Sequence, residues 1–141
     1  MTDSLLLDTH VWYWFAEGRA DRLARSVPRR IERAVADGRA FVSAMSAWEL
    51  GMLVAKRRLL LATDVADWID ASREPPGVRI AEVTAEIAVD STKLPGTLHY
   101  DPADRLIVAT ARSLGATLLT CDERIVAYGE DGNVRVLDAR K

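Results

Sequence analysis

The sequence lacks the features that mark secreted, membrane-spanning or disulfide-stapled proteins. Cys121 is its only cysteine, so no disulfide can form within the chain. No apolar run approaches the ~18 residues that a membrane span requires. The start, MTDSLLLDTHVW, has neither the basic segment nor the long apolar stretch of a secretory signal. We therefore expect a soluble, cytoplasmic protein that folds in a reducing interior.

Internal repeats and Gly/Ser-rich linkers are also missing, which argues against several domains. The 141 residues match the size of one ordinary domain. Hydrophobic residues make up 49% of the chain and charged residues 28%, a composition typical of globular proteins rather than disordered or fibrous ones. We predict a single domain over residues 1–141, with a core large enough to need no cross-links.

The basic residues are clustered, although the net charge of −2 gives no sign of a nucleic-acid binder. Seven arginines lie between Arg19 and Arg39, and Lys56, Arg57 and Arg58 form a second cluster. Such clusters are often only the solvated faces of helices. Two of them, on a chain whose acids gather elsewhere, are also consistent with an anionic partner.

Short apolar runs alternate with longer amphipathic stretches along the whole chain. The runs predict strands and the stretches predict helices, several of them with capping residues at their starts and one ended by Gly115. Strands this short, separated by helices, favour a parallel sheet covered on both faces. The predicted strands are 4–8, 40–43, 78–83, 117–120 and 134–137, and the clearest helix is 102–114.

Two aspartates follow predicted strands. Asp8 ends the apolar run SLLLD, and Asp122 follows TLLT after one cysteine. Parallel sheets bind ligands beyond the carboxyl ends of their strands, where the strand order switches. The same residues could instead be simple N-caps, because aspartate is favoured at the start of a helix. The sequence leaves both interpretations open for each residue.

Two further acids lie on predicted helices. Ser46 precedes Glu49 by three residues, which is the spacing of a capping box, although Ser43 could equally begin this helix. Asp101 and Asp104 occupy the N-cap and third positions of a helix that starts with proline. Capping does not explain why four acids are expected at helix N-termini along one edge of the sheet. These four are Asp8, Glu49, Asp104 and Asp122.

Four carboxylates that converge without a counter-charge would repel one another and shift toward protonation. A hard divalent cation with oxygen ligands, Mg²⁺ or Mn²⁺, resolves this conflict. Zinc is disfavoured because His10 and His99 have no paired Cys or His at ligand spacing. Such a site suits phosphodiester hydrolysis, in which one metal activates water and a second, ~4 Å away, stabilises the leaving oxygen.

Four blocks of sequence contain these acids: LLDTH (6–10), VSAMSAWEL (42–50), HYDPADRL (99–106) and LTCD (119–122). In order and spacing, from near residue 4 to near residue 137, they resemble the VapC-type toxins of the PIN-domain family. The resemblance implies a three-layer α/β/α fold with a central five-stranded parallel sheet. It also implies an Mg²⁺- or Mn²⁺-dependent endoribonuclease that acts as the toxin of a type II toxin–antitoxin pair, forms a homodimer and is silenced by a cognate antitoxin.

Carried over by position, the resemblance makes the four acids the catalytic and metal-binding residues. Asp101 matches a recurrent acid whose role we interpret as an N-cap. The polar residues that support the acids match Thr9, Ser46 and Thr120. The chain departs from the family at Ala103, where an aromatic residue is frequent, at Thr110, where glutamine is common, and at Cys121, where a charged or small residue is usual. None of these departures removes a metal ligand.

Several nearby residues have both a functional and a structural interpretation. His99 is a candidate substrate contact, although a structural hydrogen bond is the commoner role for such a histidine. Arg105 could orient Asp104 or bind phosphate of the RNA substrate. The four tryptophans could stack on bases, but their helical spacing favours the core or a dimer interface. They are Trp12, Trp14, Trp48 and Trp68.

Three other functions are weighed against the nuclease. A phosphoacceptor domain, of the receiver type or of the haloacid-dehalogenase phosphatase type, also has an aspartate after its first strand. The phosphatase needs a second aspartate two residues later, where this chain has His10, and the lysine of a receiver is missing. A PIN fold kept only for binding would lack some of the acids. An RNA-processing PIN nuclease without an antitoxin would share the whole site, and only the neighbouring gene discriminates it.

Overall fold

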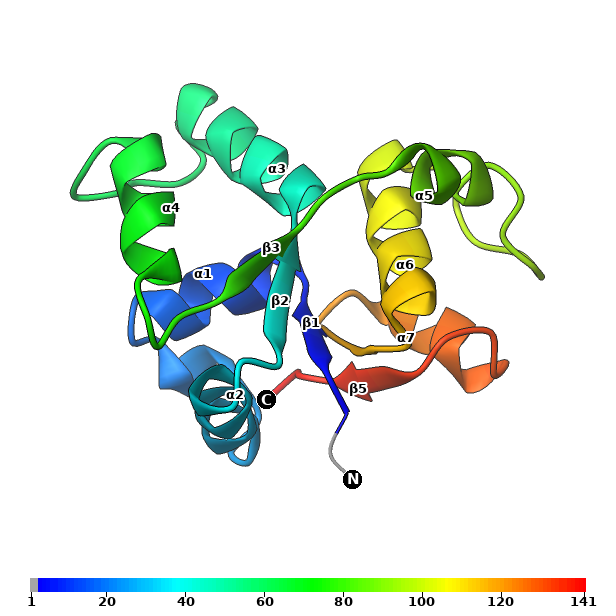
Figure 1. Ribbon diagram of the computed structural model, residues 1–141, viewed down its shortest axis with the longest axis horizontal. Helices are drawn as coiled ribbons and strands as arrows, with labels where there is room; N and C mark the ends of the chain where they lie inside the picture. Colours follow the sequence, from blue (N-terminus) through cyan, green and yellow to red (C-terminus); the bar gives the residue numbers. More distant parts are fainter. Residues whose placement is uncertain (1–2) are drawn as a thin grey trace.

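Five short parallel strands alternate with seven α-helices along residues 3–141, the part of the chain that the computed structural model describes (Figure 1). The strands are β1 (Leu5–Leu7), β2 (Ala40–Ser43), β3 (Arg79–Ala81), β4 (Thr117–Thr120) and β5 (Val136–Asp138). The helices are α1 (Thr9–Ala16), α2 (Val27–Ala36), α3 (Ala44–Ala55), α4 (Val65–Arg73), α5 (Ala85–Asp90), α6 (Pro102–Leu114) and α7 (Glu123–Glu130), with a 3-10 helix η1 (Ala20–Arg22) before α2. The predicted α/β fold with a central five-stranded parallel sheet is confirmed.

β1 lies at the centre of the sheet, whose strand order is β3-β2-β1-β4-β5. Leu7 of β1 is in register with Val42 of β2 on one side and with Leu119 of β4 on the other. The chain moves outward from β1 to β3, then crosses back through α5 and α6 to β4 on the opposite side of β1. The strand order therefore switches between β1 and β4, and the carboxyl ends of these two strands are where a ligand is expected.

Both faces of the sheet are covered, because successive side chains of a strand point to opposite faces. Leu5 and Leu7 pack with residues of α1, α2 and α4, whereas Leu6 packs with residues of α5, α6 and α7. Figure 1 shows these two groups of helices on opposite sides of the sheet. All three residues of β1 are buried, which is why the strand reads as a continuous apolar run.

Side-chain caps set where three helices begin at the carboxyl edge of the sheet. Asp8, Asp101 and Asp122 are the N-caps of α1, α6 and α7, and each accepts a hydrogen bond from a backbone N–H of the first turn. Gly115 ends α6 with φ at 63°, a left-handed conformation that favours glycine. The capping interpretation of these aspartates is therefore correct, and it does not exclude a second role for them.

The structure corrects two local expectations about α3. Ser43 is its N-cap and accepts a hydrogen bond from the Met45 N–H at 3.0 Å. Ser46 is thus inside the helix and fully buried, so the capping box with Glu49 does not form. Glu49 lies in the second turn rather than at a helix N-terminus, and it reaches the sheet edge because α3 packs across α1 and α6.

The tryptophans do not share one environment. Trp12 is fully buried in the core, as expected from its helical spacing, whereas Trp48 is 58% exposed and lies at the surface.

The last strand starts two residues later than expected, because Val134 is buried within the preceding turn rather than in the sheet. None of the helices in residues 3–141 is long and apolar enough to cross a membrane.

Candidate metal centre

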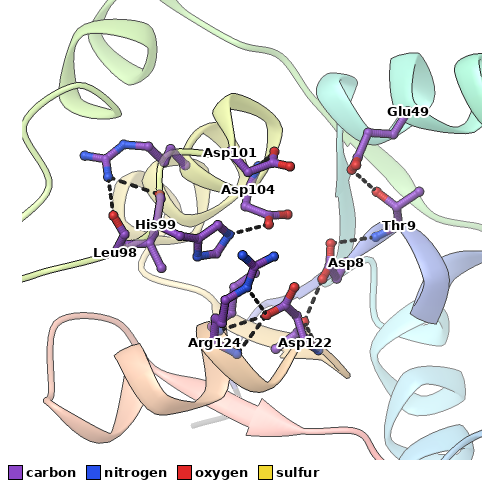
Figure 2. A network of polar contacts seen from close by, with 12 residues as sticks. Asp8, Thr9, Glu49, Leu98, His99, Asp101, Asp104, Asp122 and Arg124 are labelled. Atoms are coloured by element: carbon purple, nitrogen blue, oxygen red, sulfur yellow. Dashed lines mark hydrogen bonds and ion pairs between the residues drawn. The ribbon is translucent and has the colours of Figure 1, made fainter.

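A cavity of about 560 Å³ opens at the carboxyl ends of β1 and β4, at the switch in strand order. The four predicted site acids line it, together with Asp101 and the guanidinium-bearing residues Arg22 and Arg124. In Figure 2 the carboxylates come from different elements and face a shared space. Asp8 follows β1, Glu49 lies on α3, Asp104 lies on α6 and Asp122 precedes α7.

Asp8 is fixed by one hydrogen bond to each carboxylate oxygen. The Thr9 N–H donates to Oδ1 at 2.9 Å, and the Thr120 hydroxyl donates to Oδ2 at 2.6 Å. The same Thr120 hydroxyl accepts a hydrogen bond from the Asp122 N–H at 3.0 Å. One fully buried threonine therefore connects the acids that follow β1 and β4, and neighbours of this kind hold functional groups in a single geometry.

Glu49 is held by a second pair of hydroxyl groups. The Thr9 hydroxyl donates to Glu49 Oε1 at 2.6 Å and lies 2.9 Å from the Ser46 hydroxyl oxygen. Since a hydroxyl carries only one proton, Ser46 is the donor to Thr9 in this chain of contacts. Thr9 and Ser46 are buried. All three residues expected to support the acids thus contact the acids or one another.

Asp104 contacts a histidine. His99 Nε2 donates to Asp104 Oδ2 at 2.6 Å (Figure 2), and the buried Nδ1 of the same ring has no hydrogen-bond partner among the described residues. His99, Asp104 and Asp122 each offer one donor atom within 4.8 Å of the other two. His99 thus makes the structural hydrogen bond that its position in the sequence allowed, and its partner is one of the site acids.

Two arginines near the site have different roles. The Arg105 guanidinium donates to the carbonyls of Ser91 at 2.8 Å and Leu98 at 2.9 Å, so it braces the segment that carries His99. This use favours a positioning role over the phosphate contact considered from sequence. Arg124, which sequence reasoning missed, lines the cavity with its Nε 3.9 Å from Asp122 Oδ1. Its position two residues after Asp122, in the first turn of α7, was the available signal.

Burial raises the pKa of three of the four acids. It raises the pKa of Glu49 to about 7, opposed by the Thr9 hydrogen bond and increased by the nearby Asp8 and Asp104 carboxylates. Burial also raises the pKa of Asp8, against the Thr120 hydrogen bond, and the pKa of Asp104, against the His99 hydrogen bond. Repulsion between carboxylates was the expected cause. It contributes, but loss of hydration is larger.

The three departures from the family pattern do not disturb the acids. Ala103 is buried, and the buried Thr110 donates its hydroxyl to the Leu106 carbonyl at 2.7 Å. Cys121 lines the cavity, where burial raises the pKa of its thiol to about 11. At neutral pH this side chain is therefore a thiol, which is a poor ligand compared with the carboxylates beside it.

The donor set of the cavity fits a hard divalent cation. Carboxylate oxygens are the ligands that Mg²⁺ and Mn²⁺ prefer, and hydroxyl or backbone groups already fix three of the four carboxylates, those of Asp8, Glu49 and Asp122. Burial disfavours the charged forms of Asp8, Glu49 and Asp104, and a bound cation would favour those forms again. The residues that could hold it are Asp8, Glu49, Asp104 and Asp122.

The fold and this acidic centre define the class of protein, and comparison with known families agrees: the chain belongs to the PIN domain family, whose pattern matches residues 5–131. Over 125 residues the chain is 37% identical to Ribonuclease VapC22 of Mycobacterium tuberculosis. These aligned residues make up 89% of this chain and 92% of the relative. The predicted family is thereby confirmed, and the phosphoacceptor alternative is set aside.

Solved structures with low sequence identity share the fold. One is VapBC2 from Rickettsia felis bound to a DNA fragment from their promoter, with a TM-score of 0.70, 16% identity and coverage of 96% of this chain and 98% of the other. Another is FitAcB from Neisseria gonorrhoeae, with a TM-score of 0.64, 20% identity and coverage of 95% and 96%. The likeness extends over nearly the whole length of each chain.

Proposed function

We propose that the chain is a divalent-metal-dependent endoribonuclease and the toxin of a type II toxin–antitoxin pair. The observation that carries the proposal is the cavity at the strand switch of a PIN fold, where the four predicted site acids come together from four parts of the chain. The 37% identity to a protein named a ribonuclease supports RNA as the substrate. Mg²⁺ or Mn²⁺ is the cation we propose, and the cytoplasm, which holds RNA and a co-expressed antitoxin, is the compartment.

When bound, a divalent cation would polarise the scissile phosphate and lower the pKa of the attacking water. The residues of the chain supply placement and charge. Thr120 holds the Asp8 carboxylate in position, and Thr9 does the same for Glu49. Arg22 and Arg124 line the same cavity, where a guanidinium can bind non-bridging phosphate oxygens and stabilise charge that develops on them.

RNA cleavage by single-residue variants tests the proposal. Asp8→Asn, Glu49→Gln, Asp104→Asn and Asp122→Asn should each lower Mn²⁺-dependent cleavage by orders of magnitude while the protein stays folded. Asp101→Asn is the matched control, because Asp101 caps α6 and asparagine caps helices equally well. Wild-type turnover by the Asp104→Asn protein would remove Asp104 from the site, and no cleavage by wild type with either cation would refute the nuclease.

The proposed partner is a small antitoxin protein. Its Arg or Lys would enter the acidic cavity and replace the charge of the cation, while apolar residues would cover nearby surface. Trp48, which directly precedes Glu49 in α3 and is 58% exposed, offers apolar surface for this contact. Complexes named VapBC and FitAB among the structural neighbours support this pairing. We also propose that the toxin is a homodimer, which its molar mass in solution will test.

An open reading frame beside the gene should encode this antitoxin. Its product should bind the purified chain and relieve the growth arrest that the chain causes when expressed alone. If it neither binds nor protects, and expression of the chain does not arrest growth, the toxin assignment fails. An RNA-processing nuclease without an antitoxin would then be the remaining interpretation, provided that RNA cleavage is observed.

A further inference from the structure

A groove on the exposed side of α2 is lined almost entirely by arginines. Its volume is about 530 Å³, and its lining residues are Arg25, Ser26, Arg29, Arg30 and Arg33. All four arginines are exposed. Within residues 3–141 none of the four takes part in an ion pair, whereas arginines elsewhere on the surface, such as Arg135 and Arg140, pair with aspartates.

The positive charge of this groove is not balanced from within α2. Glu32 is the only acid in the helix, and it forms no ion pair with the arginines in the part of the chain that the structure describes. Like charges three or four residues apart on a helix repel one another. A polyanion lying in the groove would relieve this repulsion, and arginine forks suit phosphate oxygens in particular.

The groove begins three positions along the chain from Arg22, a residue of the acidic cavity. Arg22 lines the cavity, and its guanidinium lies 5.2 Å from the centre of the Trp14 ring, which lines the same cavity. Only Leu23 and Ala24 separate Arg22 from Arg25, so the Cα atoms of the two arginines are at most ~11 Å apart. The groove therefore starts close to a residue that lines the proposed cleavage site.

The direction of α2 carries the arginines away from the site. α2 connects η1 to the start of β2, so it runs back from the carboxyl edge of the sheet and lies beside α1 (Figure 1). Arg25 and Arg29 are thus near the edge that holds the cavity, and Arg33 is ~6 Å further along the helix than Arg29. A strand leaving the cavity would meet them in the order 22, 25, 29, 33.

We propose that Arg22, Arg25, Arg29 and Arg33, here called the arginine track, bind the phosphate backbone of the single-stranded RNA that extends from the cleaved bond. The substrate class is then an RNA with several unpaired nucleotides beyond the cut, with Trp14 placed to stack on a base near the start of the track. This inference rests on the proposed nuclease function. RNA is favoured over an acidic protein segment as the occupant, because the track begins at the cavity where the proposed cation would bind a scissile phosphate.

The salt dependence of RNA binding tests the arginine track without relying on catalysis. The probe is a fluorescent, unstructured 20-nucleotide RNA, measured by anisotropy with chelator present and in an Asp104→Asn background so that no RNA is cut. Affinity falls as salt rises, and each lost phosphate contact makes the slope of log affinity against log salt less steep by ~0.7 for a single strand. Three lost contacts lower it by ~2, so wild type should lose ~16-fold more affinity than the variant between 50 and 200 mM salt.

The test variant is Arg25→Gln/Arg29→Gln/Arg33→Gln, and melting curves check that it is folded. The matched control removes three exposed positive charges elsewhere, as Arg73→Gln/Lys93→Gln/Lys141→Gln, and should keep the wild-type slope. The single variant Arg29→Gln should lower the slope by ~0.7 and guards against a misfolded triple variant. A tetranucleotide is too short to follow the track. Between 50 and 200 mM salt, its affinity for the protein should therefore fall by a factor at least ten times smaller than that of the 20-nucleotide RNA.

Three results would overturn the inference. The triple variant and its control could change the slope equally, which would make the effect one of net charge. The triple variant could bind the RNA with the wild-type slope. It could also lose affinity only for duplex DNA or for an acidic peptide, which would assign the groove to another partner. None of these results depends on whether the wild-type protein cleaves RNA. A wrong assignment of the arginine track is therefore distinguishable from a wrong assignment of the nuclease activity.

Discussion

The Glu49→Gln substitution should stabilise the protein at alkaline pH when divalent cations are removed. Burial raises the pKa of Glu49 from 4.5 to about 7, a difference that would equal ~3.4 kcal/mol in a fully enclosed site. The carboxyl is only partly buried, and solvent screening reduces the expected effect to about 1–2 kcal/mol. Glutamine keeps the carbonyl oxygen that accepts the Thr9 hydroxyl but carries no charge, so the hydrogen bond should survive.

The sign of this effect depends on pH in a defined way. Between pH 4.5 and about 7 the folded protein holds the Glu49 proton more tightly than the unfolded chain does, so wild-type stability falls as the pH rises through this window. Glu49→Gln removes that fall. Its melting temperature should match wild type near pH 5 and exceed it by about 3–6 °C at pH 8.

Thermal melts with chelator at pH 5 and pH 8 provide the assay. Glu130→Gln, at an exposed position at the end of α7, is the charge-matched control and should show no comparable gain. Millimolar Mn²⁺ should raise the wild-type melting temperature, as a ligand of the folded state does, and should do much less for Glu49→Gln. A Glu49→Gln protein that melts below wild type at pH 8, or that shows the same difference at both pH values, refutes the reasoning.

Three further substitutions test the supports of the site and the packing of α7 and α3. Thr120→Val removes the hydroxyl that donates to Asp8 and accepts from a backbone N–H, so the free energy of unfolding should fall by about 1–3 kcal/mol and cleavage should fall with it, as denaturant melts and a turnover assay will show. Gly129→Ala would place a Cβ 2.6 Å from Val136 Cγ2 and should destabilise the protein by about 1–2 kcal/mol. Gly51→Ala, whose Cβ would meet nothing within 4 Å, should instead stabilise α3 by up to ~1 kcal/mol. Equal melting temperatures of the two variants would contradict the close contact between α7 and β5.

The strands and most helix starts could be predicted because their signals are local. The apolar runs before Asp8 and Cys121 are buried on both faces of the sheet, and that burial is what makes them continuous in sequence. Asp101 caps α6 as its spacing from Pro102 indicates. The start of the last strand was misplaced from sequence, since Val134 is buried without belonging to β5, and an apolar residue has the same sequence signal in both cases.

The candidate site was predictable where its acids follow strands, and less so where tertiary packing decides. Ser46 and Glu49 have the spacing of a capping box, but α3 begins one turn earlier at Ser43, so both side chains turn toward Thr9 instead. The contact of His99 with Asp104 and the use of Arg105 to hold carbonyls of the preceding segment depend on how a loop folds back on α6. No spacing rule encodes that path.

Binding of Mn²⁺ to the folded protein tests the central claim, that Asp8, Glu49, Asp104 and Asp122 form a site for a divalent cation. Isothermal titration of wild type, Asp104→Asn and Asp101→Asn should give saturable binding for wild type, at least tenfold weaker binding for Asp104→Asn, and binding close to wild type for Asp101→Asn, whose asparagine still caps α6. Equal Mn²⁺ affinity of wild type and Asp104→Asn, or an equal loss in Asp104→Asn and Asp101→Asn, would contradict the claim.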